Sequence, residues 1–596
     1  MRIDAPQRPR QRSRHEEHAR TPLKLGDPGK RSIVLLVVTG LILSLFAGRL
    51  IELQVVRGEA LASAALDQRL KTESLPAERG NILDANGEPL AVTVEARNLT
   101  ADQTLVTDPA KVGAALAPLL GADADVLATR LTGKRRFVYL AKGLTPETWR
   151  TIAALRLPGI FSEPASRRIY PAEDLAANVV GFVGGEGKGL AGIEYAYNKQ
   201  LGGVAGTQTY ERGPGNRMIP TASQSITAAQ PGVDIRLTID RDIQYIAQQT
   251  IQQKVWESGS DSGTVVVMDP RTGQILALAT EPTFDANTPQ LAPNNWRGNR
   301  ALSDIYEPGS TSKVMTLAAV IDRGAATPST GFTIPSVLKR GGKAFHDHTP
   351  HGTLHLTLAG IMAKSSNIGT ILAAERIGGR ALFDYLQRFG IGEKTGLNFP
   401  GESRGILRDY SDWSATSFPT IAFGQGLSVN SVQAASVYAT IANDGVRVSP
   451  SLIASMTKPD GTVVDPPTPT RTQVVSPATA AQVRAMLEAV TTDEGTAPLA
   501  RIPGYRVGGK TGTAQYVDPR TGRYSRGVVA SFIGMAPIDR PQLVVAVSLV
   551  NPRHGRYGGQ LAAPVFQRVM TYALQARHIP PTGTKAPHLA LTFGAP

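Results

Sequence analysis

The longest apolar stretch of the chain lies close to its N-terminus. Ser32–Gly48 carries no charged residue, and it reaches about twenty residues if the side chain of Arg49 snorkels and the helix continues to Leu53. This pattern predicts one membrane-spanning helix, and no later apolar stretch is long enough to span. The basic residues before it favour a cytoplasmic N-terminus. A cleaved signal peptide is the alternative, since Ala62-Ser63-Ala64 resembles a cleavage site, but the long basic leader favours an uncleaved anchor.

Helical and strand-like periods alternate in short segments between this helix and Gly232. The predicted elements are a helix over Ala60–Leu70, two strands around the turn Asn86-Gly87, helices over Pro109–Leu120 and Pro146–Leu155, and a strand over Phe137–Leu140. Gly184–Gly192 is rich in glycine but lacks the Lys-Ser/Thr ending of a phosphate loop, which favours a structural turn. A polar stretch from Gly213-Pro214-Gly215 is typical of a linker. We therefore expect an extended α+β region here.

A second domain is predicted after Gly232. Its elements are a strand over Asp234–Asp240, a helix over Arg241–Trp256, a hairpin of Gly263–Met268 and Gln274–Ala279, and strands over Ser531–Met535 and Leu543–Val550. Pro308-Gly309 precedes a further helix, in which apolar residues recur at helical spacing until Gly324 at the expected C-cap. A helix followed by an antiparallel hairpin indicates a mixed α/β (α+β) domain with an antiparallel sheet flanked by helices.

Composition narrows the functional classes. Hydrophobic residues make up 41% of the 596 residues and charged residues 19%, which is typical of globular protein. The formal net charge is +14, but part of this excess lies in the leader before the apolar helix, which weakens a nucleic-acid interpretation. The chain contains no cysteine. Disulfides, cysteine-based zinc sites and thiol nucleophiles are therefore excluded.

Two polar side chains share one face of the helix predicted after Pro308-Gly309. Ser310 lies in its first turn, and Lys313 lies one turn further on. A helix N-terminus offers free N–H groups and a positive dipole end, which stabilise charge that develops on a serine. Lys313 can take the proton of Ser310 only if desolvation or a nearby cation lowers its pKa. A capping serine beside a solvated lysine is the alternative.

Two further groups of polar residues lie later in the chain. Ser365 and Asn367 begin a second helical pattern, and such a pair can relay a proton and hold a substrate carbonyl. The other group consists of Lys510, Thr511, Gly512 and Thr513 on a predicted strand edge. Its lysine and threonine hydroxyls can bind a carboxylate, its glycine lets a ligand approach, and a backbone N–H can serve an oxyanion. Each group alone also fits an ordinary turn or surface loop.

In this order, Ser-x-x-Lys, Ser-x-Asn and Lys-Thr-Gly resemble the signature of the penicillin-recognising serine enzymes, and specifically of the class B penicillin-binding proteins. The resemblance extends from the anchor to about Arg577. Segments that add to it are Glu307-Pro308-Gly309-Ser310-Thr311, Asp269-Pro270-x-Thr272-Gly273, Arg79-Gly80-x-Ile82-x-Asp84-x-x-Gly87 and Arg168-x-Tyr170-Pro171. Ser365-Ser366-Asn367-Ile368-Gly369 is more similar to the septal, cell-division subgroup than to the elongation subgroup.

The resemblance implies a peptidoglycan D,D-transpeptidase that uses no cofactor and no metal. Ser310 would attack the penultimate D-Ala carbonyl of a stem peptide, neutral Lys313 would be the base, and Ser365 would help pass the proton to the leaving D-Ala. The substrate-binding residues would be Asn367, Lys510, Thr511, Gly512 and Thr513. The amine of a second stem peptide would then take the acyl group, and β-lactams would leave Ser310 acylated. The N–H groups of Ser310 and Thr513 would form the oxyanion hole.

The same resemblance implies a domain order and a location. The expected parts are a basic cytoplasmic tail over residues 1–31, a transmembrane anchor over 32–53, a pedestal domain of the dimerisation type over 54–230, a transpeptidase domain over 231–577 and an extended tail over 578–596. The catalytic domain would lie outside the plasma membrane. Expected partners are stem peptides, lipid-linked precursors, β-lactams, the membrane, a glycosyltransferase and other cell-division membrane proteins, but no nucleic acid.

Related activities are distinguished by missing motifs. Glu173-Asp174 lacks the phenylalanine of the glycosyltransferase motif in class A relatives, so a partner would polymerise the glycan strands. A β-lactamase would need Glu-x-x-Leu-Asn after Ser-x-Asn, and Glu393–Asn398 has one residue too many. A D,D-carboxypeptidase and an elongation-type transpeptidase remain alternatives. A mainly scaffolding role in cell division is disfavoured by three intact motifs.

Two other clusters suggest different chemistry. The histidines His346, His348, His351 and His355 could indicate a metal, but their spacing fits no standard zinc helix signature. Asp304 and Glu307 lie near Ser310 in the sequence. A paired-carboxylate mechanism is not expected there, because the proposed nucleophile has its own base.

Overall fold

The computed structural model describes residues 28–212, 219, 224–518 and 521–594. Most of the predicted cytoplasmic tail and the start of the predicted linker at Gly213 lie outside these residues. The chain divides into two compact units, one formed by residues 1–75 and 207–228 and the other by residues 76–206 and 229–596.

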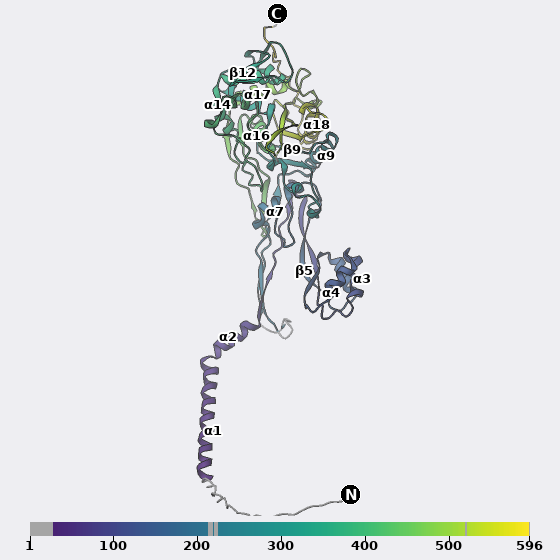
Figure 1. Cartoon of the computed structure of the whole chain (residues 1–596), viewed down its shortest axis with the longest axis vertical. Coiled ribbons are helices and arrows are strands. Elements are labelled where there is room, and N and C mark those ends of the chain that lie inside the picture. The colour runs from purple at the N-terminus through teal and green to yellow at the C-terminus, as the bar shows by residue number, and fades with distance from the viewer. Residues whose placement is uncertain (1–27, 213–218, 220–223, 519–520, 595–596) are drawn as a thin grey trace, which may run out of the picture. The chain divides into compact units, whose positions relative to one another are not determined.

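The first unit contains the N-terminal apolar helix (Figure 1). Its elements are α1 (Pro28–Ile51), a π-helical turn over Glu52–Val56, α2 (Gly58–Arg69) and a three-stranded sheet in the order β1 (Leu70–Leu75), β6 (Gly206–Glu211) and β7 (Gln224–Thr227). Residues 28–56 form the only helix in the described part of the chain that is long and apolar enough to cross a membrane. None of the residues of α1 is buried, so its apolar surface is available to lipid.

The second unit begins with the expected α+β region. Its elements are β2 (Ile82–Leu83), β3 (Pro89–Ala101), α3 (Pro109–Leu120), α4 (Ala124–Leu131), β4 (Val138–Leu144), α5 (Pro146–Ala154), β5 (Ile160–Ile169), α6 (Ala177–Val180), α7 (Gly192–Ala196) and α8 (Asn198–Leu201). Asp108 caps α3, Pro109 opens it, and Gly121 ends it at φ 58°. The long strand β3 pairs with β2, β4 and β5, and Figure 1 shows α3 and α4 beside β5. A separate small core holds this part together.

A buried ion cluster joins the motif residues of this region. Glu194 is fully buried, and its carboxylate accepts hydrogen bonds from Nε of Arg79 at 2.6 Å and from Nε of Arg168 at 2.7 Å. These charge-assisted bonds offset the cost of burying the carboxylate. A Cβ on Gly189 would lie 1.9 Å from the carbonyl oxygen of Glu194. The stretch Gly184–Gly192 is therefore a structural turn, as predicted, that needs glycine at this close approach.

The rest of the second unit from β8 (Asp234–Leu237) onward carries the three motifs and is here called the catalytic part; it is organised around an antiparallel five-stranded sheet, as expected. The strand order is β10 (Ile275–Glu281), β9 (Ser262–Met268), β21 (Leu543–Val550), β20 (Arg523–Ala536) and β19 (Gly508–Asp518). Helices α9 (Arg241–Ser258) and α18 (Gly558–Ala576) pack on its strands, as does α16 (Ser431–Ala442). The predicted hairpin and the two predicted C-terminal strands are thus confirmed.

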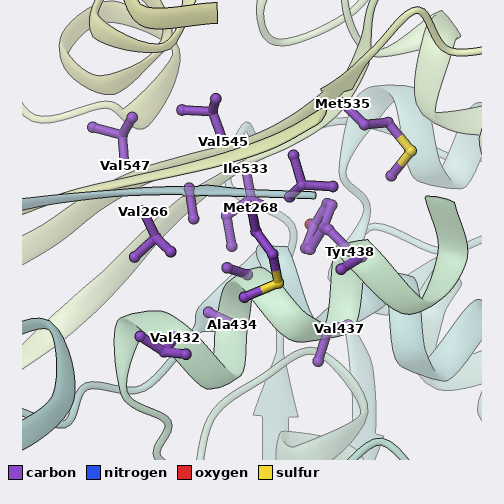
Figure 2. Packing of buried hydrophobic residues seen from close by; sticks show 14 of the residues in the cluster. Val266, Met268, Val432, Ala434, Val437, Tyr438, Ile533, Met535, Val545 and Val547 are labelled. Carbon is purple, nitrogen blue, oxygen red and sulfur yellow. The ribbon is translucent and has the colours of Figure 1, made fainter. Parts of the chain in front are cut away.

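Strand alternation sorts the side chains of this sheet between its two faces. Figure 2 shows Val266, Met268 and Ile533 pointing toward α16, and Val545 and Val547 pointing away from it. All five are buried, and α18 packs on β20 and β21. The sheet is apolar on both faces because helices cover both. This core fixes the position of β19 at the edge of the sheet.

The remaining elements surround the sheet. They are α10 (Arg300–Ser303), α11 (Lys313–Asp322), β11 (Gly331–Ile334), β12 (Leu338–Arg340), β13 (Lys343–Phe345), β14 (Leu354–Thr357), α12 (Leu358–Lys364), α13 (Asn367–Glu375), α14 (Gly378–Arg388), α15 (Ser417–Ala422), β15 (Val446–Val448), β18 (Arg471–Gln473) and α17 (Pro477–Ala489), with short 3-10 turns over 289–291, 294–296, 309–312, 410–412 and 498–500. β11 pairs with β14, β12 with β13, and β15 with β18.

The strand predicted to open the second domain belongs to a shared sheet. β8 (Asp234–Leu237) lies parallel to β2 and antiparallel to β16 (Ile453–Thr457), which pairs in turn with β17 (Val463–Val464). One sheet therefore contains strands of the α+β region and of the catalytic part. Local sequence patterns do not reveal this pairing, because the three strands are far apart in the chain.

Candidate active site

The loop that carries Ser310 is held by close backbone contacts. Residues Gly309–Ser312 form a 3-10 turn and α11 begins at Lys313, so Ser310 precedes the α-helix instead of lying in its first turn as predicted. Gly309 has a φ of 53°, and its N–H donates to the carbonyl of Gly424 at 2.9 Å. A Cβ on Gly424 would lie 2.0 Å from the carbonyl oxygen of Gly309. Both positions therefore favour glycine.

Lys313 is completely buried directly behind this loop. Its Nζ donates to the carbonyl oxygen of Ser365 at 2.6 Å and to Oδ1 of Asn367 at 2.8 Å, and it lies 3.3 Å from Oγ of Ser365. Burial lowers the pKa of Lys313 to about 7, while the negative charge of Asp347 acts in the opposite direction. A substantial fraction of this amine is therefore neutral near pH 7, as a general base requires.

Ser365 and Asn367 lie where two short helices meet, and Asn367 begins the second of them, at the start of a helical segment as predicted. α12 ends at Lys364 with Ser365, whose φ is 61°, as its C-cap, and α13 begins after its N-cap Ser366. A left-handed conformation is costly for a residue other than glycine and is retained where surrounding structure enforces it. Here it brings the backbone and side chain of Ser365 and the amide of Asn367 to one lysine.

Asp347 fixes this junction, and sequence reasoning missed it. One carboxylate oxygen accepts from the hydroxyl of Ser366 at 2.6 Å, and the other accepts from the N–H of Ile368 at 2.9 Å. His351 Nε2 lies 3.1 Å from the same carboxylate, and the carbonyl of His346 accepts from the Asn367 amide at 3.1 Å. The only signal in the sequence is the group of histidines around Asp347.

The histidines and carboxylates near the motifs have separate contacts. The ring of His348 meets that of Tyr557 at 5.1 Å between centroids, and the ring of His355 meets that of Phe593 at 5.4 Å. Asp304 pairs with Arg300 on the surface, while Oε1 of Glu307 accepts from the N–H of Gly426 and the hydroxyl of Tyr524. Glu307 therefore supports the loop next to Ser310, and the two carboxylates do not form a pair.

The third motif lies on β19, the edge strand of the sheet, beside the 3-10 turn of Ser310. A Cβ on Gly512 would lie 2.3 Å from Oγ of Ser531 and 3.0 Å from Cγ2 of Thr311, so glycine lets the strand approach the loop. Lys510 is completely buried, and its Nζ lies 3.3 Å from Oγ1 of Thr511. Burial, followed by the positive charge of Lys313, lowers the pKa of Lys510 well below its usual value.

A cleft of about 1030 Å³ connects the three motifs. Residues of the motifs that line it are Ser310, Ser365, Asn367, Thr511 and Thr513. The two lysines Lys313 and Lys510 are fully buried and do not line it. The structure thus brings candidate residues of all three motifs to one cleft, with Lys313 buried in contact with Ser365 and Asn367, while Gly512 lies between Thr511 and Thr513 on β19. A hydroxyl, a buried amine and backbone N–H groups in this arrangement can carry out acyl transfer.

Comparisons with known proteins agree with this geometry. Residues 263–571 match the penicillin-binding protein transpeptidase domain, and residues 74–237 match the penicillin-binding protein dimerisation domain. PbpB of Mycolicibacterium smegmatis is 36% identical over 588 residues, covering 92% of this chain and 91% of that protein. The peptidoglycan D,D-transpeptidase FtsI of Escherichia coli is 33% identical over 550 residues, covering 91% of each.

Solved structures show the same fold. The crystal structure of penicillin-binding protein 3 from Mycobacterium tuberculosis, in complex with aztreonam, superposes with a TM-score of 0.70 at 33% identity and covers 88% of this chain and 100% of that chain. Both family matches, the extent of identity and the fold lead to one assignment. The chain belongs to the class B penicillin-binding proteins.

Proposed function

We propose that the chain is a membrane-anchored peptidoglycan D,D-transpeptidase that cross-links stem peptides through an acyl-enzyme on Ser310 and binds penicillin covalently. The observation that carries the proposal is the fully buried Lys313, whose pKa is lowered to about 7 and whose Nζ contacts both Ser365 and Asn367. The family match and the relatives named peptidoglycan D,D-transpeptidases support the same activity.

In the proposed reaction, Oγ of Ser310 attacks the carbonyl carbon of the penultimate D-Ala, and Lys313 takes the hydroxyl proton. The peptide C–N bond then breaks, the proton passes through Ser365 to the leaving D-Ala amine, and an ester on Ser310 remains. The amine of a second stem peptide attacks this ester, loses its proton to the site and restores the Ser310 hydroxyl. Attack by water at the same step would give a D,D-carboxypeptidase.

The remaining motif residues bind the substrate in this proposal. Asn367 orients the donor amide, while Lys510, Thr511 and Thr513 hold the terminal carboxylate, and Gly512 leaves room for the peptide. The N–H groups of Ser310 and Thr513 stabilise the oxyanion. Loss of one such donor typically costs about 3 kcal/mol of transition-state stabilisation.

Labelling with a fluorescent penicillin tests the nucleophile. The wild-type protein and Ser303→Ala, which removes an exposed serine hydroxyl outside the cleft, should both carry the label after denaturation. Ser310→Ala should carry none, and a labelled Ser310→Ala protein would refute the assignment.

Product analysis separates the transpeptidase from the carboxypeptidase. Incubation with a glycan polymer that carries pentapeptide stems should give cross-linked dimers with release of D-Ala. Tetrapeptide monomers as the sole product would favour the carboxypeptidase.

We further propose that the protein acts in septal wall synthesis, with its N-terminus in the cytoplasm and residues 231–577 outside the membrane as the transpeptidase domain. In this arrangement the anchor spans 32–53 and residues 54–230 form the pedestal. The Ser-Ser-Asn form of the second motif and the similarity to FtsI support the septal role, and partners would include a glycosyltransferase and other division proteins. A fluorescent fusion that labels the side wall and leaves division sites dark would favour the elongation role.

A further inference from the structure

The C-terminal tail, expected to be a simple extended segment, packs back along the catalytic part. After α18, the carbonyl of Ile579 accepts from the Tyr505 hydroxyl at 2.6 Å. The hydroxyls of Thr582 and Thr584 then donate to the carboxylate of Asp539 at 3.1 and 2.6 Å. Beyond these contacts, the tail reaches β14, where its last described residues bind.

Residues Leu589–Phe593, here called the C-terminal strap, lie along β14 and the start of α12. Leu356 of β14 and Thr592 form an antiparallel bridge. Thr357, the N-cap of α12, donates from its N–H to the carbonyl of Leu591 at 3.0 Å and from its hydroxyl to the carbonyl of Ala590 at 2.7 Å. The strap therefore holds the N-cap residue of α12.

The strap lies so close to α12 and β11 that two positions facing it have no room for a side chain. A Cβ on Gly360 would lie 1.9 Å from the carbonyl oxygen of Leu591, and a Cβ on Gly331 would lie 2.7 Å from the ring of Phe593. That ring also meets the ring of His355 edge to face. Two glycines thus make room for the strap, one in α12 and one in β11.

The short helix α12 links the strap to the second motif. It runs from its N-cap Thr357 to its C-cap Ser365, and Leu358–Ala363 are all buried, so the helix is packed against its neighbours along most of its length. Ser365 at its far end contacts the Nζ of Lys313. Thr592 itself lines the cleft that contains Ser310. A displacement at the start of α12 is therefore transmitted to the proton-transfer residues.

We propose that the C-terminal strap is a positioning element of the active site, which holds α12 so that Ser365 and Asn367 stay in contact with Lys313. This inference rests on the proposed function, since it assigns the strap to the acylation of Ser310. It extends the functional part of the chain beyond Arg577. A misplacement of about 1 Å in a catalytic constellation can reduce a rate on the order of a hundredfold.

Truncation of the full-length protein in detergent tests the strap. A chain that ends at His588 should be acylated by fluorescent penicillin at least about tenfold more slowly than wild type. A chain that ends at Gly594 keeps the strap and should react at the wild-type rate. Phe593→Ala is a milder variant that removes one ring, and the exposed Phe161→Ala is its matched control. Wild-type rates in both the His588 truncation and Phe593→Ala would overturn the proposal.

A double-mutant cycle separates positioning from a general loss of stability. If the strap acts through the second motif, truncation at His588 should cost little further rate in a Ser365→Ala background. If the two losses multiply, the strap does not act through Ser365 and the proposal is wrong. Failure of the proposed function would appear separately, as labelling of Ser310→Ala.

Discussion

Lys313 experiences two opposing effects, and their balance decides its charge. Its hydrogen bonds to the Ser365 carbonyl and the Asn367 amide oxygen favour the ammonium form, as does the charge of Asp347. Complete burial favours the neutral amine, and it is the larger effect on the pKa. Lys510 is buried as well, and after burial itself the positive charge of Lys313 contributes to lowering the pKa of Lys510.

The pH dependence of acylation follows from this balance. Because Lys313 must be neutral to accept a proton, the acylation rate should rise as the pH passes through about 7 and level off above it. Lys313→Ala should lower the rate by about 10² to 10⁴-fold. Stopped-flow acylation between pH 5.5 and 9 measures both effects, with the exposed Lys339→Ala as control. A flat profile in the wild-type protein would exclude Lys313 as the base.

At the scale of single residues, the sequence motifs name candidate residues but do not predict their backbone conformations or contacts. The spacing of Ser310 and Lys313 alone also fits a capped helix with a solvated lysine, and only the order of the three motifs suggested a nucleophile and its base. The left-handed backbone of Ser365 and the contacts of Asp347 depend on segments that fold together from different parts of the chain. The helix and strand propensities of neighbouring residues therefore do not predict this backbone conformation or these contacts.

Strand β19 carries the glycine of the third motif, Gly512, next to the loop of Ser310. Gly512→Ala would place a methyl group 2.3 Å from Oγ of Ser531 and 3.0 Å from Cγ2 of Thr311, so Ser531 must reorient and the strand or the loop of Ser310 must shift. We expect penicillin acylation to fall on the order of tenfold or more while the protein remains folded. Gly298→Ala, which has no atom within 4 Å of the new Cβ, is the control and should react normally. Equal acylation rates in both variants would contradict this account of β19.

The end of β10 should make stability depend on pH. Burial, followed by repulsion from Asp174, raises the pKa of Glu281 to about 7 in the folded protein, from an ordinary value near 4.5. The folded state then binds more protons than the unfolded state, so this group costs stability as the pH rises from about 4.5 through 7. Glu281→Gln should therefore raise the melting temperature at pH 8 more than at pH 5. The exposed Glu147→Gln should show no such difference.

Element prediction succeeded where periodicity and caps coincide. The helix expected over Pro109–Leu120 has these bounds in the structure, because a capping aspartate, a first-turn proline and a terminal glycine mark it. The second motif was expected at the start of a helical pattern, and α13 does begin at Asn367, while Ser365 is the C-cap of the preceding helix α12. The side chain of Ser366 caps the N-terminus of α13 and so separates it from α12. Apolar periodicity alone does not reveal this break.

Over the whole second unit, the α+β region and the catalytic part are joined by a shared sheet, and a buried ion cluster holds the α+β region together beside that sheet. β8 pairs with both β2 and β16. Arg79 lies just before β2 in the chain, and its guanidinium contacts Glu194. This arrangement makes the region a structural support of the catalytic part. The family resemblance indicated two domains in the right order, but not that they share backbone hydrogen bonds.

Removal of Arg79 should weaken this support. Arg79→Ala leaves the fully buried carboxylate of Glu194 with Arg168 as its one remaining guanidinium partner among the described residues. We expect a loss of about 3 kcal/mol in the free energy of unfolding, measured by urea denaturation. Arg97→Ala removes a more exposed guanidinium whose nearest carboxylate oxygen lies 3.9 Å away, and it should change stability by less than about 1 kcal/mol. Similar losses in both variants would contradict a central role for the cluster.

The order of strands in the five-stranded sheet also constrains how the chain can reach its native state. β9, in which every residue is buried, pairs on one side with β10, which follows it directly, and on the other with β21. During synthesis, Met268 therefore has no β21 partner until Val544 has been added to the chain, and the hydrogen bonds between β9 and β21 form only then. Until then the edge of an apolar strand is open to wrong partners. The central strand of this sheet, β21, is thus the last of the five to be synthesised, so the sheet of a growing chain can be completed only after its other four strands are present.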